Sequence, residues 1–296
     1  MCMEIIPAKK LLMPTKGTMT DFFYSNYTLN LYRGCSHGCI YCDSHSVCYH
    51  MASFGTVRKK ADCLALLRQE LAAKRRSGMI FMGSGSDPYN PFEQAERLTR
   101  GSLELIRRYR FGISLSTKSH TILQDADLLA DIQRIAPVNI CFSITCAEDA
   151  MCRLVEPEAA YTSLRFEAME ALVRKGVFCG LWLNPVLPFI TDSWCNLKTL
   201  LAMTKEAGGQ FAVCHFGMTL REGSRELYYK GLDEGFPGLK ERYVRTFGNS
   251  YLCPSPHAAE LEKLYRQECE RLGLFYRFKD INTAVMAPRF SQLSFC

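Results

Sequence analysis

Residues 28–42 read Thr-Leu-Asn-Leu-Tyr-Arg-Gly-Cys-Ser-His-Gly-Cys-Ile-Tyr-Cys. The first five form a short, largely apolar run that ends close to a glycine, and this pattern predicts a β-strand. Three cysteines follow at once with the spacing C-x3-C-x2-C, and we call residues 35–42 the cysteine loop. Because (β/α) barrels build their active sites at the carboxyl ends of strands, this position favours a functional site.

The three cysteines of the loop, Cys35, Cys39 and Cys42, indicate a metal centre with one open position. A structural zinc site is closed by four ligands, and a ferredoxin [4Fe–4S] cluster takes four cysteines. Three thiolates would leave one iron free for chemistry. Three other interpretations stay open: chance clustering in a cysteine-rich chain, an electron-transfer cluster completed by Cys48, and zinc. The candidate fourth ligands for zinc are His37, His45, His50 and Cys48.

The composition is that of a globular protein. Hydrophobic residues make up 48% and charged residues 22% of the 296 positions, which excludes disordered, collagen-like and coiled-coil proteins. The net charge of +6 permits an anionic partner without requiring one. With no export signal visible, the 15 cysteines are expected to be mostly buried, reduced thiols. The longest uncharged stretch, Gly176–Thr191, is too short to span a bilayer. We therefore expect a cytoplasmic protein with no membrane partner.

Short apolar runs alternate with amphipathic segments, which predicts βα units and a parallel sheet. Several runs are apolar at both parities, as in strands that are covered on both faces. The predicted strands are Thr28–Tyr32, Met79–Met82, Gly112–Thr117, Val138–Ile144, Val177–Asn184 and Gln210–Met218. The predicted helices are Asp62–Lys74, Thr99–Arg108, Asp125–Arg134, Tyr161–Lys175, Asp192–Ala207, Glu241–Phe247 and Pro256–Leu272. Asp125 is expected to cap its helix.

Polar residues gather directly after each predicted strand. Such residues also dominate ordinary turns, but six clusters, with Asp87 and Lys118 among them, favour one shared mouth. Because six units are visible, we predict an α/β fold, a partial (β/α)6 TIM-type barrel with parallel strands and a C-terminal α-rich extension. The predicted parts are an N-terminal extension (1–24), the barrel (25–225) and a C-terminal extension packed on the barrel (226–296). An incomplete barrel leaves a lateral opening, which suits a substrate larger than a metabolite.

The cysteine loop, with Tyr41 just before its last cysteine, resembles the signature of the radical S-adenosylmethionine (SAM) superfamily. More narrowly, the chain resembles the spore photoproduct lyase-like branch over about residues 25–260. The segments that carry this narrower resemblance are Gly34–Cys42, Ser86–Pro91, Thr117–Ser119, Ser143–Thr145 and Arg221–Ser224. The superfamily folds as a partial (β/α)6 barrel whose cluster loop follows strand one, which agrees with the strand pattern read above.

The resemblance implies two cofactors, a [4Fe–4S] cluster held by the three cysteines and SAM bound at the open iron. An electron from the cluster would cleave SAM reductively into methionine and a 5′-deoxyadenosyl radical, which abstracts hydrogen from a C–H bond. The cofactors supply this chemistry and the protein supplies orientation. We therefore expect a radical SAM enzyme, lyase-like, whose substrate the sequence does not identify; the open barrel and mild basicity suggest a macromolecule such as a nucleic acid.

The resemblance also suggests which residues contact SAM. Lys118 is a cation suited to the SAM carboxylate, with a surface lysine as the alternative. Ser84, Gly85 and Ser86 stand where the superfamily has a glycine-rich stretch, and backbone there can approach the SAM amino group because glycine has no side chain. The other expected contacts are Ser143 to the ribose or carboxylate, Asp87 to SAM, to a neighbour or to its own turn, Tyr41 to the adenine, and Asn184 to the ribose.

The chain departs from spore photoproduct lyase in its hydrogen-atom donor. In that enzyme a cysteine just past strand two returns a hydrogen atom to the product radical, whereas here no cysteine lies between Cys63 and Cys141. A hydroxyl is a poor hydrogen-atom donor, so strict thymine-dimer repair is not expected. The candidate donors are Cys141, Cys146 and Tyr89, each with a purely structural role as the alternative.

The partner expected for this chemistry is an electron donor, a reductase or a flavodoxin or ferredoxin, and we expect a monomer. Arg33 would either stabilise the reduced cluster or bond a loop carbonyl. Three basic runs are interpreted as solvated surface or helix-end charges rather than a nucleic-acid track: Arg58–Lys60, Lys74–Arg76 and Arg107–Arg108. A zinc-stabilised nucleic-acid-binding module and an electron-transfer iron–sulfur protein are the alternative functions.

Overall fold

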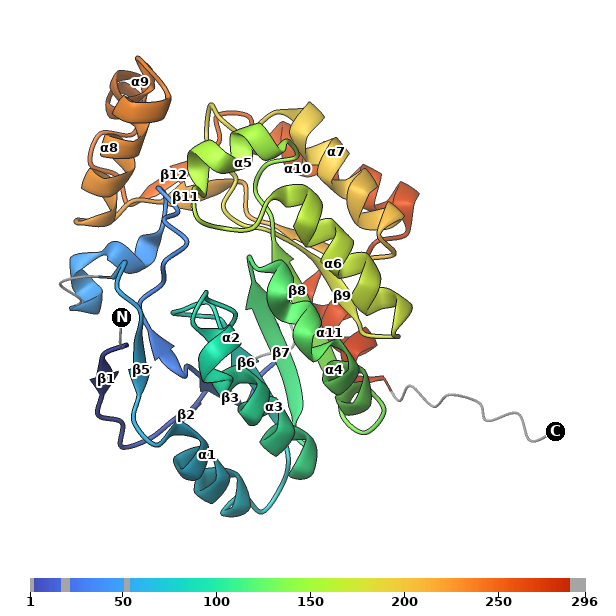
Figure 1. The fold of residues 1–296 in the computed structure, drawn as a ribbon. Helices are drawn as coiled ribbons and strands as arrows, with labels where there is room; N and C mark the ends of the chain where they lie inside the picture. The colour runs from blue at the N-terminus through green and yellow to red at the C-terminus, as the bar shows by residue number, and fades with distance from the viewer. Residues whose placement is uncertain (1–2, 17–21, 51–53, 288–296) are drawn as a thin grey trace.

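The structure, a computed structural model, describes residues 3–16, 22–50 and 54–287 (Figure 1). Its centre is a sheet of seven described strands, six of them parallel and in chain order, with β2 antiparallel at one edge. In spatial order they are β10 (Phe211–Cys214), β9 (Cys179–Leu183), β8 (Val138–Ser143), β7 (Gly112–Thr117), β6 (Met79–Met82), β3 (Tyr27–Leu29) and β2 (Leu12–Pro14).

Helices connect the parallel strands and lie along the outer face of the sheet (Figure 1). They are α1 (Cys63–Ala72), α2 (Glu93–Glu96), α3 (Leu98–Arg108), α4 (Ala126–Gln133), α5 (Asp149–Val155), α6 (Thr162–Arg174) and α7 (Trp194–Glu206). In the described part of the chain β10 does not pair with β3, so the sheet stays open. Six parallel strands with outer helices confirm the α/β class and the partial (β/α)6 TIM-type barrel.

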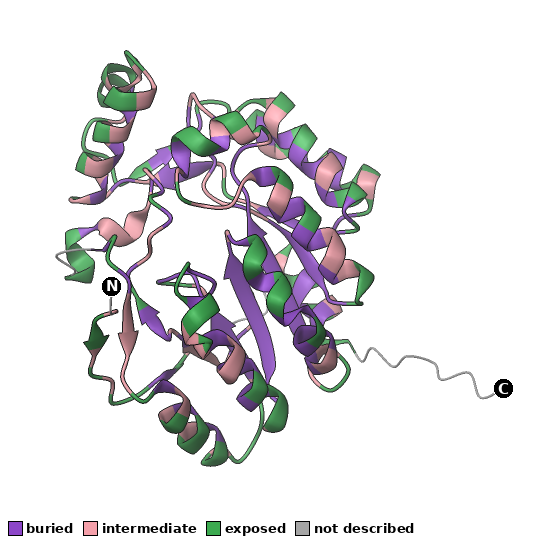
Figure 2. Cartoon of the chain, in the orientation of Figure 1, coloured by how far each residue is buried: buried purple, intermediate pink, exposed green. Residues whose placement is uncertain are grey.

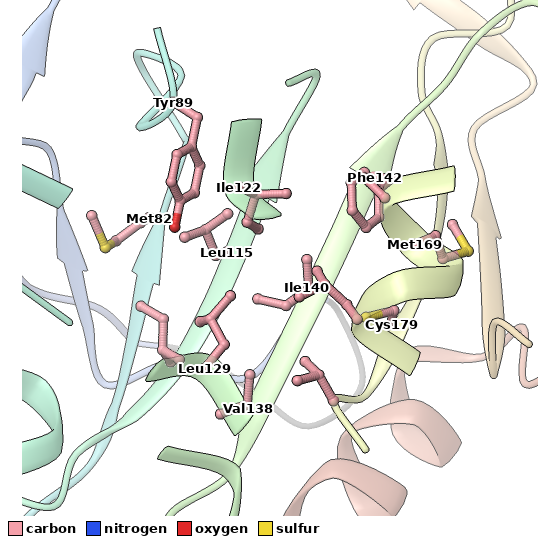
Figure 3. Packing of buried hydrophobic residues seen from close by; sticks show 14 of the residues in the cluster. Met82, Tyr89, Leu115, Ile122, Leu129, Val138, Ile140, Phe142, Met169 and Cys179 are labelled. Carbon is pink, nitrogen blue, oxygen red and sulfur yellow. The ribbon is translucent and has the colours of Figure 1, made fainter. Parts of the chain in front are cut away.

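The central strands are buried on both faces (Figure 2). Residues of one parity, such as Leu115 and Ile140, pack against helix residues such as Leu129 (Figure 3). Residues of the other parity, such as Phe81 and Cys141, form a separate apolar cluster. Fully burying one large apolar side chain contributes about 1.5–3 kcal/mol. The double burial explains why these strands are apolar at consecutive positions.

The starts of two predicted helices are stabilised in different ways. Ser193 caps α7, since its side chain accepts a hydrogen bond from the backbone N–H of Asn196. Asp125 occupies the predicted N-cap position of α4, but its side chain makes no capping hydrogen bond to the helix. Its carboxylate instead accepts hydrogen bonds from the Tyr89 hydroxyl at 3.1 Å and from Arg100 at 2.8 Å. A sequence pattern cannot show this, because both partners belong to other elements.

The predicted first strand, Thr28–Tyr32, is divided between two sheets. β3 pairs with β6 in the barrel. Two residues later the chain forms β4 (Tyr32–Arg33), which pairs with β5 (Arg58–Lys60) in a small sheet completed by β1 (Ile5–Ile6). Arg58–Lys60 is therefore a strand and not a helix end. The change of partner turns the cysteine loop over the open end of the barrel.

The predicted sixth strand, Gln210–Met218, is divided in the same way. β10 ends at Cys214, and β11 (Gly217–Thr219) pairs antiparallel with β12 (Leu252–Pro254) outside the barrel. A single apolar run does not show such a change of partner, because the local pattern is the same on both sides of the break.

The C-terminal part contributes four helices to the described chain. They are α8 (Ser224–Gly235), α9 (Leu239–Phe247), α10 (Ala258–Leu272) and α11 (Phe278–Met286). α10 lies against α7, and its Tyr265 hydroxyl donates to the carbonyl of Ala212 in β10 at 2.7 Å (Figure 1). α8 and α9 lie against each other and apart from α10 and α11 (Figure 1). No described helix is both long enough and apolar enough to cross a membrane.

Candidate active site

An open pocket of about 680 Å³, which we call the cysteine pocket, lies at the carboxyl ends of the barrel strands. All three cysteines of the loop line it, together with residues that follow β6, β7, β8 and β9. The predicted shared mouth therefore exists for these strands. The predicted site residues that line this pocket are Cys35, Cys39, Cys42, Ser84, Gly85, Ser86, Asp87, Lys118, Ser143 and Asn184.

The residue directly before the cysteine loop, Gly34, is a glycine that no other residue can replace without strain. Gly34 has φ +89°, and a Cβ at this position would lie 2.2 Å from the carbonyl oxygen of Thr56. The next residue, Cys35, donates its backbone N–H to the carbonyl of Phe54 at 2.9 Å. The loop is therefore held against the 54–56 segment at its first turn.

The thiols of the loop have different electrostatic environments. Burial raises the pKa of the Cys35 thiol, but the hydrogen bond and charge of His37 outweigh burial and lower it below its usual value. Burial raises the pKa of Cys39 well above the usual range, and Lys118 only partly offsets this. Nδ1 of His37 lies 3.6 Å from Oδ2 of Asp87, so the imidazole links the cysteine loop to the turn that follows β6.

The donor set of the loop fits an iron–sulfur cluster. Three soft thiols face one pocket, and beside these cysteines in the chain Ser36 Oγ and Asp43 Oδ1 are buried without a hydrogen-bond partner among the described residues. No three described His, Cys, Asp or Glu side chains are gathered closely enough to hold one metal ion. Of the candidate fourth zinc ligands, His37 lines the pocket, whereas Cys48 is exposed and accepts a hydrogen bond from Arg221 at 3.1 Å.

Lys118 and Ser143 meet across the pocket wall. Lys118 follows β7 and Ser143 ends β8, and Lys118 Nζ donates to Ser143 Oγ at 2.9 Å. Burial lowers the pKa of Lys118, but the negative charge of Cys39 when its thiol is ionised and that of the Glu156 carboxylate outweigh burial and raise it. The half-buried ammonium is therefore a permanent positive charge facing the pocket, suited to an anionic group of a ligand.

Asp87 is fully occupied by the protein itself. Oδ1 accepts the backbone N–H of Tyr89 and the hydroxyl of Thr117, each at 2.8 Å, and Oδ2 accepts the backbone N–H of Lys118 at 2.7 Å. Together with its contact to His37, these bonds join the turn after β6, the end of β7 and the cysteine loop. Asp87 thus caps its own turn and orients its neighbours.

The glycine-rich turn after β6 presents backbone to the pocket. Gly83 has φ +99°, and a Cβ there would lie 2.2 Å from the carbonyl oxygen of Ser116. Ser86 turns away, since its hydroxyl donates to the carbonyl of Gly34. Ser84 exchanges hydrogen bonds with Asn30. A Cβ at Gly85 would meet only the Asn30 side chain, at 3.8 Å, and Gly85 lines the pocket, so a ligand can approach the chain here.

Tyr41 is held by a buried ion pair that no sequence pattern predicts. Its hydroxyl donates to Glu156, and Glu156 accepts from Arg165 at 2.5 Å. Arg165 has 0% exposure and also donates to the carbonyl of Ser143 at 2.7 Å. The Tyr41 ring therefore lies under the loop and borders a neighbouring pocket. An arginine at a helical position is usually exposed, so no local pattern marked Arg165.

A second pocket of about 1100 Å³, which we call the aromatic pocket, adjoins the first. The two share Cys42, Trp182 and Asn184. Phe22 lies edge-on to Trp182 with ring centroids 5.6 Å apart, and both rings line this space. Trp182 belongs to β9 and faces the barrel interior, and no local pattern marks it because it has the sequence context of an ordinary strand residue.

The three candidate hydrogen-atom donors do not line the cysteine or the aromatic pocket. Cys141 has 0% exposure and lies two residues before Ser143, packed among apolar side chains. Cys146 lies in the apolar cluster beneath Tyr41. Tyr89 donates its hydroxyl to Asp125 and belongs to the main core. Packing therefore gives each of them a structural position in this conformation.

Comparisons with known proteins agree with this geometry. The sequence model of the Radical SAM superfamily matches residues 29–196. An uncharacterized protein of Mycobacterium tuberculosis is 30% identical over 237 residues, which cover 77% of this chain and 69% of the relative. An uncharacterized protein of Methanocaldococcus jannaschii is 30% identical over 190 residues, 63% of this chain and 68% of the relative.

Among solved structures, spore photoproduct lyase in complex with a dinucleoside spore photoproduct has a similar fold, with a TM-score of 0.65. The similarity covers 92% of this chain and 81% of that enzyme at 15% sequence identity. A likeness at this identity concerns the fold, and it shows the spore photoproduct lyase-like barrel that the sequence predicted. With the family match over more than half of its length, the chain belongs to the radical SAM superfamily of enzymes.

Proposed function

We propose that Cys35, Cys39 and Cys42 hold a [4Fe–4S] cluster and that SAM binds beside it in the cysteine pocket. One observation carries this proposal: the three thiols of the family motif and the Lys118–Ser143 pair face the same 680 Å³ space. When bound, cluster and SAM supply a one-electron cleavage whose radical product removes a hydrogen atom from a C–H bond of the substrate. The protein binds and orients the reactants.

The residues around the pocket divide this task. The ammonium of Lys118 pairs with the SAM carboxylate, and Ser143 Oγ, already in contact with Lys118 Nζ, fixes the direction of that charge. The turn at Ser84 and Gly85 offers backbone to the SAM amino group, while Asn184 faces both pockets and suits the ribose. Asp87 positions Lys118 through its backbone N–H without contacting SAM.

The aromatic pocket is the proposed substrate side of the site. It is larger than the cysteine pocket, shares Cys42 with it, and is lined by Phe22, Trp182 and Phe278. Exposed ring faces next to the reaction centre suit a flat, apolar part of a macromolecular substrate, with nucleic acid as one candidate. We propose a monomeric enzyme that takes its electron from a reductase, a flavodoxin or a ferredoxin.

The test is anaerobic reconstitution of the full chain with iron and sulfide, followed by metal analysis and EPR with and without SAM. We expect about four irons per chain, an EPR signal of the reduced cluster that changes when SAM is added, and SAM-dependent 5′-deoxyadenosine. Cys39→Ala should abolish all three results. Cys48→Ala is the matched control, since Cys48 is exposed and outside the pocket.

Two results contradict the proposal. A colourless protein with one zinc per chain would favour the zinc-stabilised module. A brown protein whose EPR signal ignores SAM, and which forms no 5′-deoxyadenosine, would favour simple electron transfer.

A further inference from the structure

A basic pocket of about 780 Å³ adjoins the cysteine pocket on the side of the small sheet. Strands β4 and β5 contribute Arg33 and Lys60 to its wall. The residues that it shares with the cysteine pocket are Ser44, Phe54, Ser84 and Gly85. A ligand in the basic pocket would therefore lie against the same turn that we assign to SAM, on its other side.

Arg33 and Lys60 have no counterion in the described part of the chain. Arg33 pairs with Arg58 across the two strands, and Lys60 lies two residues beyond Arg58, so all three stand on the same face. Arg58 bonds Glu4 at 2.7 Å, and Lys59, on the other face, bonds Glu96 at 2.6 Å. Neither Arg33 nor Lys60 makes a side-chain hydrogen bond or ion pair with any described residue. One of the two roles expected for Arg33 was a hydrogen bond to a loop carbonyl, and Arg33 makes no such bond with the described residues.

Arg33, whose side chain is exposed, and the half-buried Lys60 carry like charges on one wall, and these charges repel each other. Burial lowers the pKa of Lys60 and the charge of Arg33 lowers it further, while Cys63 and Glu70 offset only part of this effect. The carboxylate of Glu70 is already used by the backbone N–H groups of Leu11 and Leu12, at 3.0 and 2.7 Å. An anion bound between the two cations would remove the repulsion and give both donors a partner.

We propose that the basic pocket binds a phosphate group of the substrate between Arg33 and Lys60. A guanidinium fork beside an ammonium point charge suits the several oxygens of a phosphate. Because the pocket shares a wall with the cysteine pocket, the phosphate would anchor the substrate while its reacting C–H bond faces the SAM site. This inference rests on the proposed function, since it assigns a binding position to the substrate of that reaction.

The test uses the reconstituted full chain and isothermal titration calorimetry with three small probes. Phenyl phosphate represents a phosphomonoester, diphenyl phosphate a phosphodiester, and benzoate a carboxylate of similar shape. We expect at least one phosphate probe to bind more tightly than benzoate, and Lys60→Met to weaken it about tenfold, as for one charge-assisted hydrogen bond. Lys60→Arg should retain binding. The tighter of the two phosphate probes then tells a phosphorylated small molecule from a phosphodiester chain.

Lys59→Met is the matched control, because it removes the same charge one residue away on the opposite face and should leave the probes unaffected. SAM affinity should be unchanged in Lys60→Met, since Lys60 does not line the cysteine pocket. Equal loss in Lys59→Met and Lys60→Met, equal binding of benzoate, or no effect of Lys60→Met would each overturn the inference. If phosphate binding depends on Lys60 but no SAM is cleaved, the proposed function fails and the anion site remains.

Discussion

Lys118 is the residue on which we expect SAM affinity to depend most. It places a positive charge at the pocket wall through its bond to Ser143, and this charge has no described carboxylate in hydrogen-bond contact. We predict that Lys118→Met weakens SAM binding by about tenfold to a hundredfold, as for the loss of a hydrogen bond between charged groups. Equilibrium dialysis with the reconstituted protein measures this directly.

The control for this change is Lys230→Met, which removes the same charge from a side chain that is 75% exposed on α8. Lys118→Arg keeps the charge and should retain part of the affinity. Wild-type SAM affinity in Lys118→Met would show that the lysine is a surface residue without a role in binding.

The last residue of α5 and the residue that follows it, Val155 and Glu156, support the cysteine loop. The backbone N–H of Ile40 donates to the carbonyl of Val155 at 3.0 Å, and Glu156 joins Tyr41 to the buried Arg165. Glu156→Gln would leave the buried charge of Arg165 without the carboxylate that neutralises it. We predict a loss of about 3–5 kcal/mol in the free energy of unfolding, measured by urea denaturation of the cluster-free protein.

An exposed pair provides the comparison for Glu156. Glu170 and Arg174 form the same kind of ion pair on the surface of α6, where such pairs contribute about 0–1 kcal/mol. Glu170→Gln should therefore change the free energy of unfolding very little. Replacing both members of the buried pair, as Glu156→Gln with Arg165→Met, should recover part of the loss. Similar losses in Glu156→Gln and Glu170→Gln would argue against the supporting role.

The first turn of the cysteine loop depends on Gly34. An added methyl group would lie 2.2 Å from the Thr56 carbonyl at a positive φ, so the loop must move. We predict that Gly34→Ala lowers the iron content after reconstitution to less than about half of wild type, because three ligands must be held together. Gly55→Ala is the control, since its methyl would meet no described atom within 4 Å. Full iron loading of Gly34→Ala would disprove this account of the turn.

The whole barrel resembles that of spore photoproduct lyase. With dinucleoside spore photoproduct as the substrate, however, we expect the reaction to end before the hydrogen atom is returned to the product radical. No cysteine lies between Cys63 and Cys141, and the three candidate donors are packed outside the cysteine and aromatic pockets. We predict that the reconstituted protein, given SAM, dithionite and dinucleoside spore photoproduct, releases no thymidine. Formation of 5′-deoxyadenosine in the same mixture is the control for active protein. Thymidine release would show that another group donates the hydrogen atom.

Local sequence was sufficient for several elements. β6 and β7 have the predicted bounds, Met79–Met82 and Gly112–Thr117, because an apolar run between glycines or polar residues is complete within itself. The helices α2, α5, α8 and α11 were not predicted. α8 has a mostly polar sequence with few apolar positions, so its periodicity is weak and its place depends on the loop segment it contacts.

By itself the sequence determined the three thiols, their place after the first strand and the alternation that builds a parallel barrel, since these depend on spacing along the chain. Tertiary structure alone decided which distant side chains meet. It joined Lys118 to Ser143, used Asp87 in hydrogen bonds to its neighbours, packed Cys141, Cys146 and Tyr89 away from the cysteine pocket, and left Arg33 and Lys60 without an ion-pair partner among the described residues. Such contacts depend on how strands and loops pack in three dimensions, and a local pattern carries no record of that packing.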